Sequence, residues 1–263
     1  MTTAASSLAT TSVDLVGLPL PYAEAGTGDP LLVLPHETGT MSGAEFRELL
    51  AAGHRVIAPT LPGWDGSERH EWMSSVRDVA ALLHLFLDKL GIDRLDVVGL
   101  GFGGWIAAEM ATTNQARFAH LILVNAYGLQ PAEGEILDQF LLGHEDYLRH
   151  GFHDEARFAA HYAEGVPSVD ELVEQDENRE MTARVAWKPY MFNHTLPPLL
   201  TEVQTPTRVI WSRDGKMAPV SCGRQYVEAL PNATLEVIGD AGHFVELEQP
   251  QALADAVEAF CSS

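Results

Sequence analysis

The stretch DVVGLGFGGWIAAEMA (96–111) is typical of a buried strand, a glycine turn and an apolar helix. Its centre, GLGFG, has the outline of a Gly-x-Ser-x-Gly turn, which holds a nucleophilic serine above the end of a strand. The third position is Gly101, and neither neighbour, Leu100 or Phe102, offers a nucleophile if the alignment is shifted by one residue. Any chemistry at this turn therefore has to proceed without a serine.

Other polar side chains follow predicted strands. His36 and Glu37 follow LLVLP, Asp214 follows PTRVIWS, and His243 follows ATLEVIG. Histidine is the usual general base near neutral pH, so His243 is the candidate base, with a structural histidine as the alternative. In open α/β sheets, sites form at the carboxyl ends of the strands. Chemistry is therefore expected just after four strand ends, at Leu34, Leu100, Asn125 and Trp211.

Short apolar runs alternate with longer helical patterns along most of the chain. The predicted strands are 31–35, 54–59, 94–100, 118–126, 206–212 and 233–239, after two short N-terminal strands within 13–26. The predicted helices between and after them are 43–53, 75–91, 102–113, 223–230 and 250–260. His84 and Glu109 lie in these helices and are interpreted as structural. The β-α-β alternation predicts a parallel sheet covered on both faces.

From residue 128 to residue 203 the pattern is helical, without a buried strand. We interpret 128–203 as a helical cap inserted in a core of residues 1–127 and 204–263, because β-α-β alternation resumes at 206. A row of helices packed beside the sheet is the alternative. Most aromatic residues of this stretch are predicted to form its own core, and one or two to line a pocket: Phe140, Tyr147, Phe152, Phe158, Tyr162, Trp187, Tyr190 and Phe192.

Four stretches together resemble the α/β-hydrolase family: VIAPTLPGWDGS, DVVGLGFGGWIAAEMA, TPTRVIWSRDGKMAP and VIGDAGHFVELEQP. Each falls where that family has its strand, elbow, acid loop and histidine loop. The chain is most similar to capped bacterial members such as meta-cleavage-product hydrolases and haloperoxidase-like esterases. The resemblance covers essentially the whole chain and implies a mostly parallel, eight-stranded sheet flanked by helices, with an inserted helical cap.

The resemblance also implies roles for single positions. The family's nucleophile falls on Gly101 and its base on His243, which is intact. Its acid falls on Gly215 when Trp211 and Pro219 are aligned. Asp214 stands one residue earlier, and either turns towards His243 or is an exposed loop carboxylate.

The oxyanion loop departs from the family's His-Gly pattern, since Pro35 and His36 stand in those places. The resemblance implies an oxyanion hole made by the backbone N–H groups of Glu37 and Phe102, the second at a helix N-terminus. The side chains of His36 and Glu37 lie at the pocket mouth, or alternatively cap the loop and point to solvent. A metal site of His36, Glu37 and His243 is conceivable, but the spacing gives no tight ligand signal, so we predict no metal and no cofactor.

The composition excludes several function classes. The 16 Lys and Arg against 37 Asp and Glu give a formal charge of −21, so nucleic acid binding is not expected. The N-terminus lacks a signal-peptide pattern, no apolar run is long enough to span a bilayer, and the two cysteines have no CxxC partner. We expect a cytoplasmic protein with a small-molecule substrate and no membrane partner. A homo-oligomer is left open.

Two classes of function fit these residues. In the first, the protein is an enzyme in which His243 activates water against a small carbonyl compound, by hydrolysis or C–C bond cleavage without a covalent intermediate. The same arrangement could abstract a substrate proton in a lyase, decarboxylase or cyclase. In the second, the protein is a pseudo-hydrolase that binds a small ligand without turnover. Retention of His243 favours the enzyme.

Overall fold

The strands are β1 (Ala9–Leu15), β2 (Leu18–Ala25), β3 (Pro30–Leu34), β4 (Arg55–Pro59), β5 (Leu95–Leu100), β6 (Phe118–Val124), β7 (Thr207–Ser212) and β8 (Ala233–Ile238). In the computed structural model, which describes residues 9–40, 43–162 and 169–262, they form one sheet in the order β1-β2-β4-β3-β5-β6-β7-β8. The β1–β2 and β2–β4 pairs are antiparallel, and the pairs from β4 to β8 are parallel. The sheet is therefore mostly parallel, as predicted.

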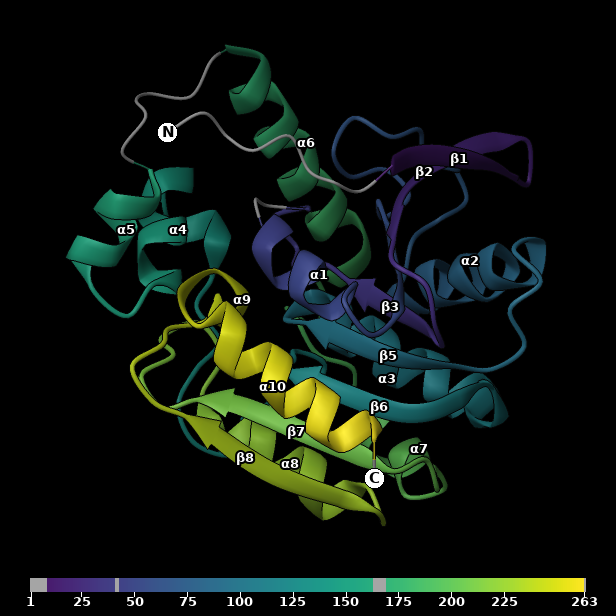
Figure 1. Ribbon diagram of the computed structural model, residues 1–263. Helices are drawn as coiled ribbons and strands as arrows, with labels where there is room; N and C mark the ends of the chain where they lie inside the picture. The colour runs from purple at the N-terminus through teal and green to yellow at the C-terminus, as the bar shows by residue number, and fades with distance from the viewer. Residues whose placement is uncertain (1–8, 41–42, 163–168, 263) are drawn as a thin grey trace.

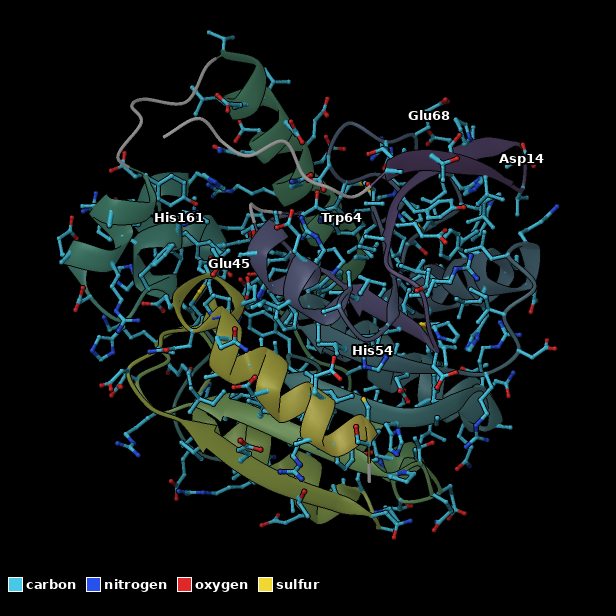
Figure 2. All side chains as sticks on the ribbon, viewed as in Figure 1. Asp14, Glu45, His54, Trp64, Glu68 and His161 are labelled. Atoms are coloured by element: carbon cyan, nitrogen blue, oxygen red, sulfur yellow. The ribbon has the colours of Figure 1, made fainter. Side chains whose placement is uncertain are left out.

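The helices are α1 (Ala44–Leu50), α2 (Val76–Lys89), α3 (Phe102–Asn114), α4 (His144–Gly151), α5 (Glu155–His161), α6 (Val169–Ala186), α7 (Leu196–Leu200), α8 (Val220–Ala229), α9 (Val245–Glu248) and α10 (Pro250–Cys261). Helices α1 and α10 cover one face of the sheet, and α2, α3 and α8 cover the other (Figure 1). Side chains fill the layers between the sheet and the helices (Figure 2). Within the described ranges, the structure has no helix that is long and apolar enough to cross a membrane.

Local sequence explains most of these elements. In α2 the apolar residues recur on one face, the Ser75 hydroxyl accepts the Asp78 N–H at the N-cap, and the turn after the helix places Gly91 at φ +67°. The interiors of β3, β5 and β6 are buried, as expected for parallel strands covered on both faces. The prediction for α1 was too long, since this helix ends at Leu50 and not at Gly53.

The stretch between β6 and β7, residues 125–206, contains α4, α5, α6 and α7 and is called here the β6–β7 segment. In its described residues, which leave out 163–168, the regular elements are helices, as the sequence predicts, and Figure 1 shows α4, α5 and α6 beyond one end of the sheet. Its α4 contacts the core, because Phe244 N–H donates to the Gly151 carbonyl at 3.2 Å and a Cβ atom on Gly151 would overlap the Phe244 ring. The end of α4 is thus fixed against the loop that carries His243.

Candidate functional site

The turn between β5 and α3 has the backbone of a nucleophile elbow. Gly101 adopts φ +49° and ψ −107° at the helix N-cap, a conformation that side-chain-bearing residues rarely occupy. A Cβ atom on Gly103 would overlap the backbone of Leu34 and Pro35, so the absent side chain lets α3 lie against the end of β3. The backbone conformation at residue 101 and the close approach at residue 103 therefore each favour glycine. The turn places residue 101 at the carboxyl edge of the sheet.

The space beside Gly101 is taken by two imidazole rings. A Cβ atom built on Gly101 would overlap the His36 ring, with Nδ1 as the nearest atom and Cε1 at 2.9 Å. The same Cβ would lie 3.0 Å from Nε2 of His243. The ring centroids of His36 and His243 are 5.1 Å apart. His36 and His243 thus converge on the position where an elbow serine would carry its side chain.

His36 is buried and is held by a buried carboxylate. Only 2 % of the residue is exposed, and Nε2 lies 3.3 Å from both carboxylate oxygens of Glu246, on α9. Burial acts to lower the pKa of His36, but the charge and hydrogen bond of Glu246, with a smaller effect of Glu37, raise it above the usual value. The sequence-based alternative that His36 points to solvent is therefore wrong.

His243 is fully buried in the same place. Its Nδ1 and Nε2 have no hydrogen-bond partner among the described residues, and burial, together with the neighbouring His36, holds its pKa well below the usual value. Its backbone is fixed by Asn125, whose Nδ2 donates to the His243 carbonyl at 2.9 Å and whose Oδ1 accepts the Ser212 N–H at 2.8 Å. His243 is thus a neutral imidazole in a rigid loop.

Glu37 is a buried carboxylate held by phenols. Its Oε1 accepts a hydrogen bond from the Tyr147 hydroxyl at 2.6 Å and a longer one from the Tyr127 hydroxyl at 3.4 Å. Burial and the charge of Glu37 raise the pKa of both phenols well above the usual value, so both remain protonated donors. Trp64, labelled in Figure 2, donates its indole N–H to the Glu37 carbonyl at 3.0 Å. Glu37 faces the interior too, against the solvent-facing alternative.

The structure thereby brings together His36, Glu37 and His243, which lie in two distant parts of the sequence. One donor atom of each lies within 4.8 Å of the other two, and all three residues are buried. Their loose spacing along the chain offers no reason to join them before the fold is known. Together they form a closed polar cluster at the elbow.

Asp214 is not part of this cluster. Its Oδ2 lies 3.3 Å from Nδ1 of His153, and its side chain is 39 % exposed. At the aligned acid position, a Cβ atom on Gly215 would overlap the Ser212 hydroxyl. The structure therefore places Asp214 as a partly exposed loop carboxylate, which was the second of the two alternatives, and does not bring it to His243.

The predicted oxyanion donors lie at the site. Among the described residues, the backbone N–H groups of Glu37 and Phe102 donate no hydrogen bond to the protein. The Phe102 N–H is the first of α3, where the helix dipole favours a negative charge. These two groups stay candidates for binding a developing oxyanion.

Four residues of the site had no role assigned from the sequence: Asn125, named only as a strand end, Tyr147, named only among the aromatic residues of 128–203, and Tyr127 and Glu246, which were not named. Asn125 and Tyr127 come directly after β6, at a strand end where chemistry was expected. Their place at this strand end is the sequence signal that could have identified them as site residues. Glu246 lies on α9, which begins two residues after His243, and its contact with His36 depends on how the loops pack, so the sequence carries no signal for it. His84 and Glu109 are structural as expected, since they bond to the Met110 carbonyl and to Arg77 and Trp105.

Relatives with known names cover nearly the whole chain. A hydrolase of Dechloromonas aromatica named for 2-hydroxy-6-oxononadienedioate and 2-hydroxy-6-oxononatrienedioate is 29 % identical over 88 % of this chain and 86 % of its own length. The 2-hydroxy-6-oxo-6-phenylhexa-2,4-dienoate hydrolase of Comamonas testosteroni is 25 % identical over 90 % of this chain and 88 % of its own.

Solved structures of the same fold superpose closely. A meta-cleavage product hydrolase of Pseudomonas fluorescens IP01 has a TM-score of 0.81 at 21 % identity, over 96 % of this chain and 97 % of its own. At that identity the likeness shows the fold. The model of the Alpha/beta hydrolase family matches residues 32–256, which is most of the chain. The elbow geometry, the sheet and this match agree: the chain belongs to the α/β hydrolase family.

Proposed function

We propose that this protein hydrolyses a small carbonyl compound by attack of water, without a covalent serine intermediate. One observation carries the proposal: the place of an elbow serine is occupied by the His36 ring, with His243 Nε2 beside it. Serine catalysis is thereby replaced by two buried imidazoles that face the same point. A water in contact with these nitrogens would take the part of the nucleophile.

The proposed reaction begins with His243 as general base. The low pKa of His243 keeps its imidazole neutral near pH 7, so it can accept a proton from water while the hydroxide forms a bond to the substrate carbonyl carbon. The carbonyl oxygen becomes an oxyanion and is held by the N–H groups of Glu37 and Phe102. The intermediate then reforms its carbonyl and breaks the bond to the leaving group, which takes the proton from His243.

Each part of this arrangement has a known order of effect. General base assistance contributes about a hundredfold to ten-thousandfold, and one oxyanion donor contributes about a hundredfold to a thousandfold. Together, the general base and the oxyanion donors can supply much of the rate enhancement without a serine nucleophile. The sum supports turnover without acyl transfer to the enzyme.

The substrate class follows from the relatives. Those proteins are named as hydrolases of 2-hydroxy-6-oxononadienedioate, 2-hydroxy-6-oxononatrienedioate and 2-hydroxy-6-oxo-6-phenylhexa-2,4-dienoate, each of which carries a 6-oxo carbonyl group. We infer a substrate of the same kind for this chain, with a C–C or ester bond beside a carbonyl. The β6–β7 segment then acts as a cap over the substrate, since its Tyr147 reaches Glu37.

The test is turnover of a 2-hydroxy-6-oxo-dienoate and of short p-nitrophenyl esters by wild type, His243→Ala and His243→Gln. Wild-type turnover that falls by about a hundredfold or more in both variants is expected, because each lacks the general base. His194→Gln is the matched control, since His194 is an exposed histidine of the same chain.

Circular dichroism of each variant keeps loss of fold apart from loss of activity. Equal turnover in folded wild type and His243→Gln contradicts the proposal. A wild type that turns over none of these substrates also contradicts it, and then favours ligand binding as the function.

A further inference from the structure

Four buried polar side-chain atoms without hydrogen-bond partners lie together at the elbow, while others are scattered over the rest of the described structure. Among the described residues, His36 Nδ1, Glu37 Oε2 and both ring nitrogens of His243 make no hydrogen bond. His36, Glu37 and His243 are each at most 2 % exposed. Native interiors pair nearly all their buried polar atoms, so such a concentration calls for a bound group.

The three residues lie close enough together to share one ion. One ligand atom of each lies within 4.8 Å of those of the other two. Ligand atoms about 2.0–2.2 Å from a common ion are separated by less than that. Binding one ion would therefore draw the three ligand atoms closer together.

The opposite atoms of these side chains are already held. His36 Nε2 bonds to the Glu246 carboxylate at 3.3 Å, and Glu37 Oε1 accepts the Tyr147 hydroxyl at 2.6 Å. A metal-bound histidine typically donates its second N–H to a carboxylate, which fixes the ring, and bound carboxylates are themselves hydrogen-bonded. His36 and Glu37 show both features of an outer shell.

Gly101 is what lets the donors meet. A Cβ atom at that position would overlap the His36 ring and lie 3.0 Å from His243 Nε2. Any side chain there would stand between the rings of His36 and His243. The glycine at the elbow thus has a positive role that is independent of the loss of a serine.

We propose, against the expectation from the spacing along the sequence, that His36, Glu37 and His243 bind one divalent transition metal ion of the Zn²⁺ type. Two imidazoles and one carboxylate form a ligand set of catalytic zinc sites, which keep a further position for water. Magnesium and calcium prefer oxygen ligands, so this donor set disfavours them. A carboxylate ligand, with Glu246 behind it, supplies negative charge to balance the ion.

The role of the ion rests on the proposed function, whereas its binding does not. In hydrolysis, the bound ion would lower the pKa of a water beside Gly101, and His243 would act as a ligand in place of a free base. Water remains the nucleophile in both forms. Binding of the ion is measured without substrate, so the two proposals can fail separately.

The experiment is calorimetric titration of the chelator-treated full chain with Zn²⁺ alone, backed by metal analysis after gel filtration. One equivalent is expected in wild type. Affinity is expected to fall by about a hundredfold or more in His36→Gln, Glu37→Gln and His243→Gln, and by about 10- to 100-fold in Glu246→Gln, which only positions His36.

Two controls identify the site. Asp96, His120 and Cys261 form another cluster whose donor atoms lie within 4.8 Å of one another, at the opposite end of the sheet, and the double variant His120→Ala/Cys261→Ser should bind Zn²⁺ like wild type. Gly101→Ala should lose affinity, whereas Gly91→Ala, also at positive φ but with open space beside it, should keep it.

The proposal is overturned if wild type binds Zn²⁺ no more tightly than a Kd of about 1 mM, or if binding is lost in the Asp96-cluster variant and kept in His36→Gln. Folding of each variant is verified by circular dichroism. Hydrolysis that persists in chelator-treated protein lacking a Zn²⁺ site would leave the proposed function in place and remove the ion. Tight binding of Zn²⁺ at the three residues without any hydrolysis would support the ion and contradict the proposed function.

Discussion

A Cβ atom on Gly101 would overlap the imidazole of His36 in its present position. The overlap is with the ring itself, since Nδ1 is the nearest atom and Cε1 lies 2.9 Å from the Cβ position. His36 is also fixed from behind by Glu246, so the ring has little freedom to withdraw. The glycine and the histidine are therefore one structural unit, and the site cannot be regarded as a serine site with a single residue missing.

Gly101→Ser is expected to damage the site and not to create a serine hydrolase. The side chain adds overlap with His36 and a positive φ for a non-glycine residue, each of which costs on the order of 1 to 3 kcal/mol. Urea unfolding should report a loss in that range or above. Labelling with a fluorophosphonate should detect no reactive serine.

Gly91→Ser is the control for this variant. Gly91 has φ +67° and nothing within 4 Å of its Cβ position, so it carries the backbone strain without the overlap. A smaller loss in Gly91→Ser than in Gly101→Ser is predicted. Equal losses would mean that His36 moves aside freely, and strong fluorophosphonate labelling of Gly101→Ser would mean that an elbow serine is accommodated.

Tyr147→Phe tests the buried carboxylate. The phenol of Tyr147 donates to Glu37 at 2.6 Å, and hydrogen bonds to charged groups contribute about 1.5–3 kcal/mol. Tyr226→Phe removes a bond to the neutral Tyr127 carbonyl, for which about 0.5–1.5 kcal/mol is typical. Urea unfolding should therefore rank the Tyr147 variant as the less stable one. The opposite ranking would contradict the larger contribution expected of the Tyr147–Glu37 hydrogen bond.

Asp214→Asn tests the position of the acid loop. The Asp214 carboxylate contacts His153 near the surface, and exposed ion pairs contribute about 0–1 kcal/mol. The free energy of unfolding of the variant should therefore stay within about 1 kcal/mol of wild type, and its kcat/KM within about twofold. A drop in kcat/KM beyond tenfold, with KM unchanged, would place Asp214 at His243 during turnover.

The first residue of α4 predicts a pH dependence of stability. Burial, with the nearby charge of Arg179, lowers the pKa of His144 to about 4 in the folded protein. In the unfolded chain the His144 imidazole takes up a proton at its usual pKa of 6.5, whereas in the folded protein it takes one up only near pH 4. The free energy of unfolding should therefore fall as the pH drops from about 6.5 to 4. His144→Gln should show a smaller fall, measured by urea unfolding across that window. The same pH dependence in both proteins would contradict this.

The fold could be predicted because local signals agreed. The apolar face of α2, its Ser75 cap and the buried runs of β3, β5 and β6 each point to one structure. The five-residue α7 was not predicted, because Pro197 and Pro198 are typical of helix breaks, although prolines are tolerated in the first turn. The four-residue α9 was also missed, since so short a helix has no period to detect.

Only those site residues that directly follow a strand could be placed from the sequence. Gly101, Phe102 and His243 follow strands, and parallel strands deliver their ends to one edge. The orientations of His36 and Glu37 were left undecided, because Glu246 and Tyr147, the side chains that turn them inward, come from α9 and α4. Contacts between elements far apart in sequence depend on how the helices pack, and a single sequence has no pattern for them.

The proposed reaction has water attack the substrate directly, at a site without serine. The most direct measurement is mass analysis of the acid product formed by wild type in H₂¹⁸O, with intact-protein mass recorded during turnover. With direct attack by water, ¹⁸O should enter the carboxylate and the protein should gain no acyl group. Product without ¹⁸O, or an acylated protein during turnover, would contradict it.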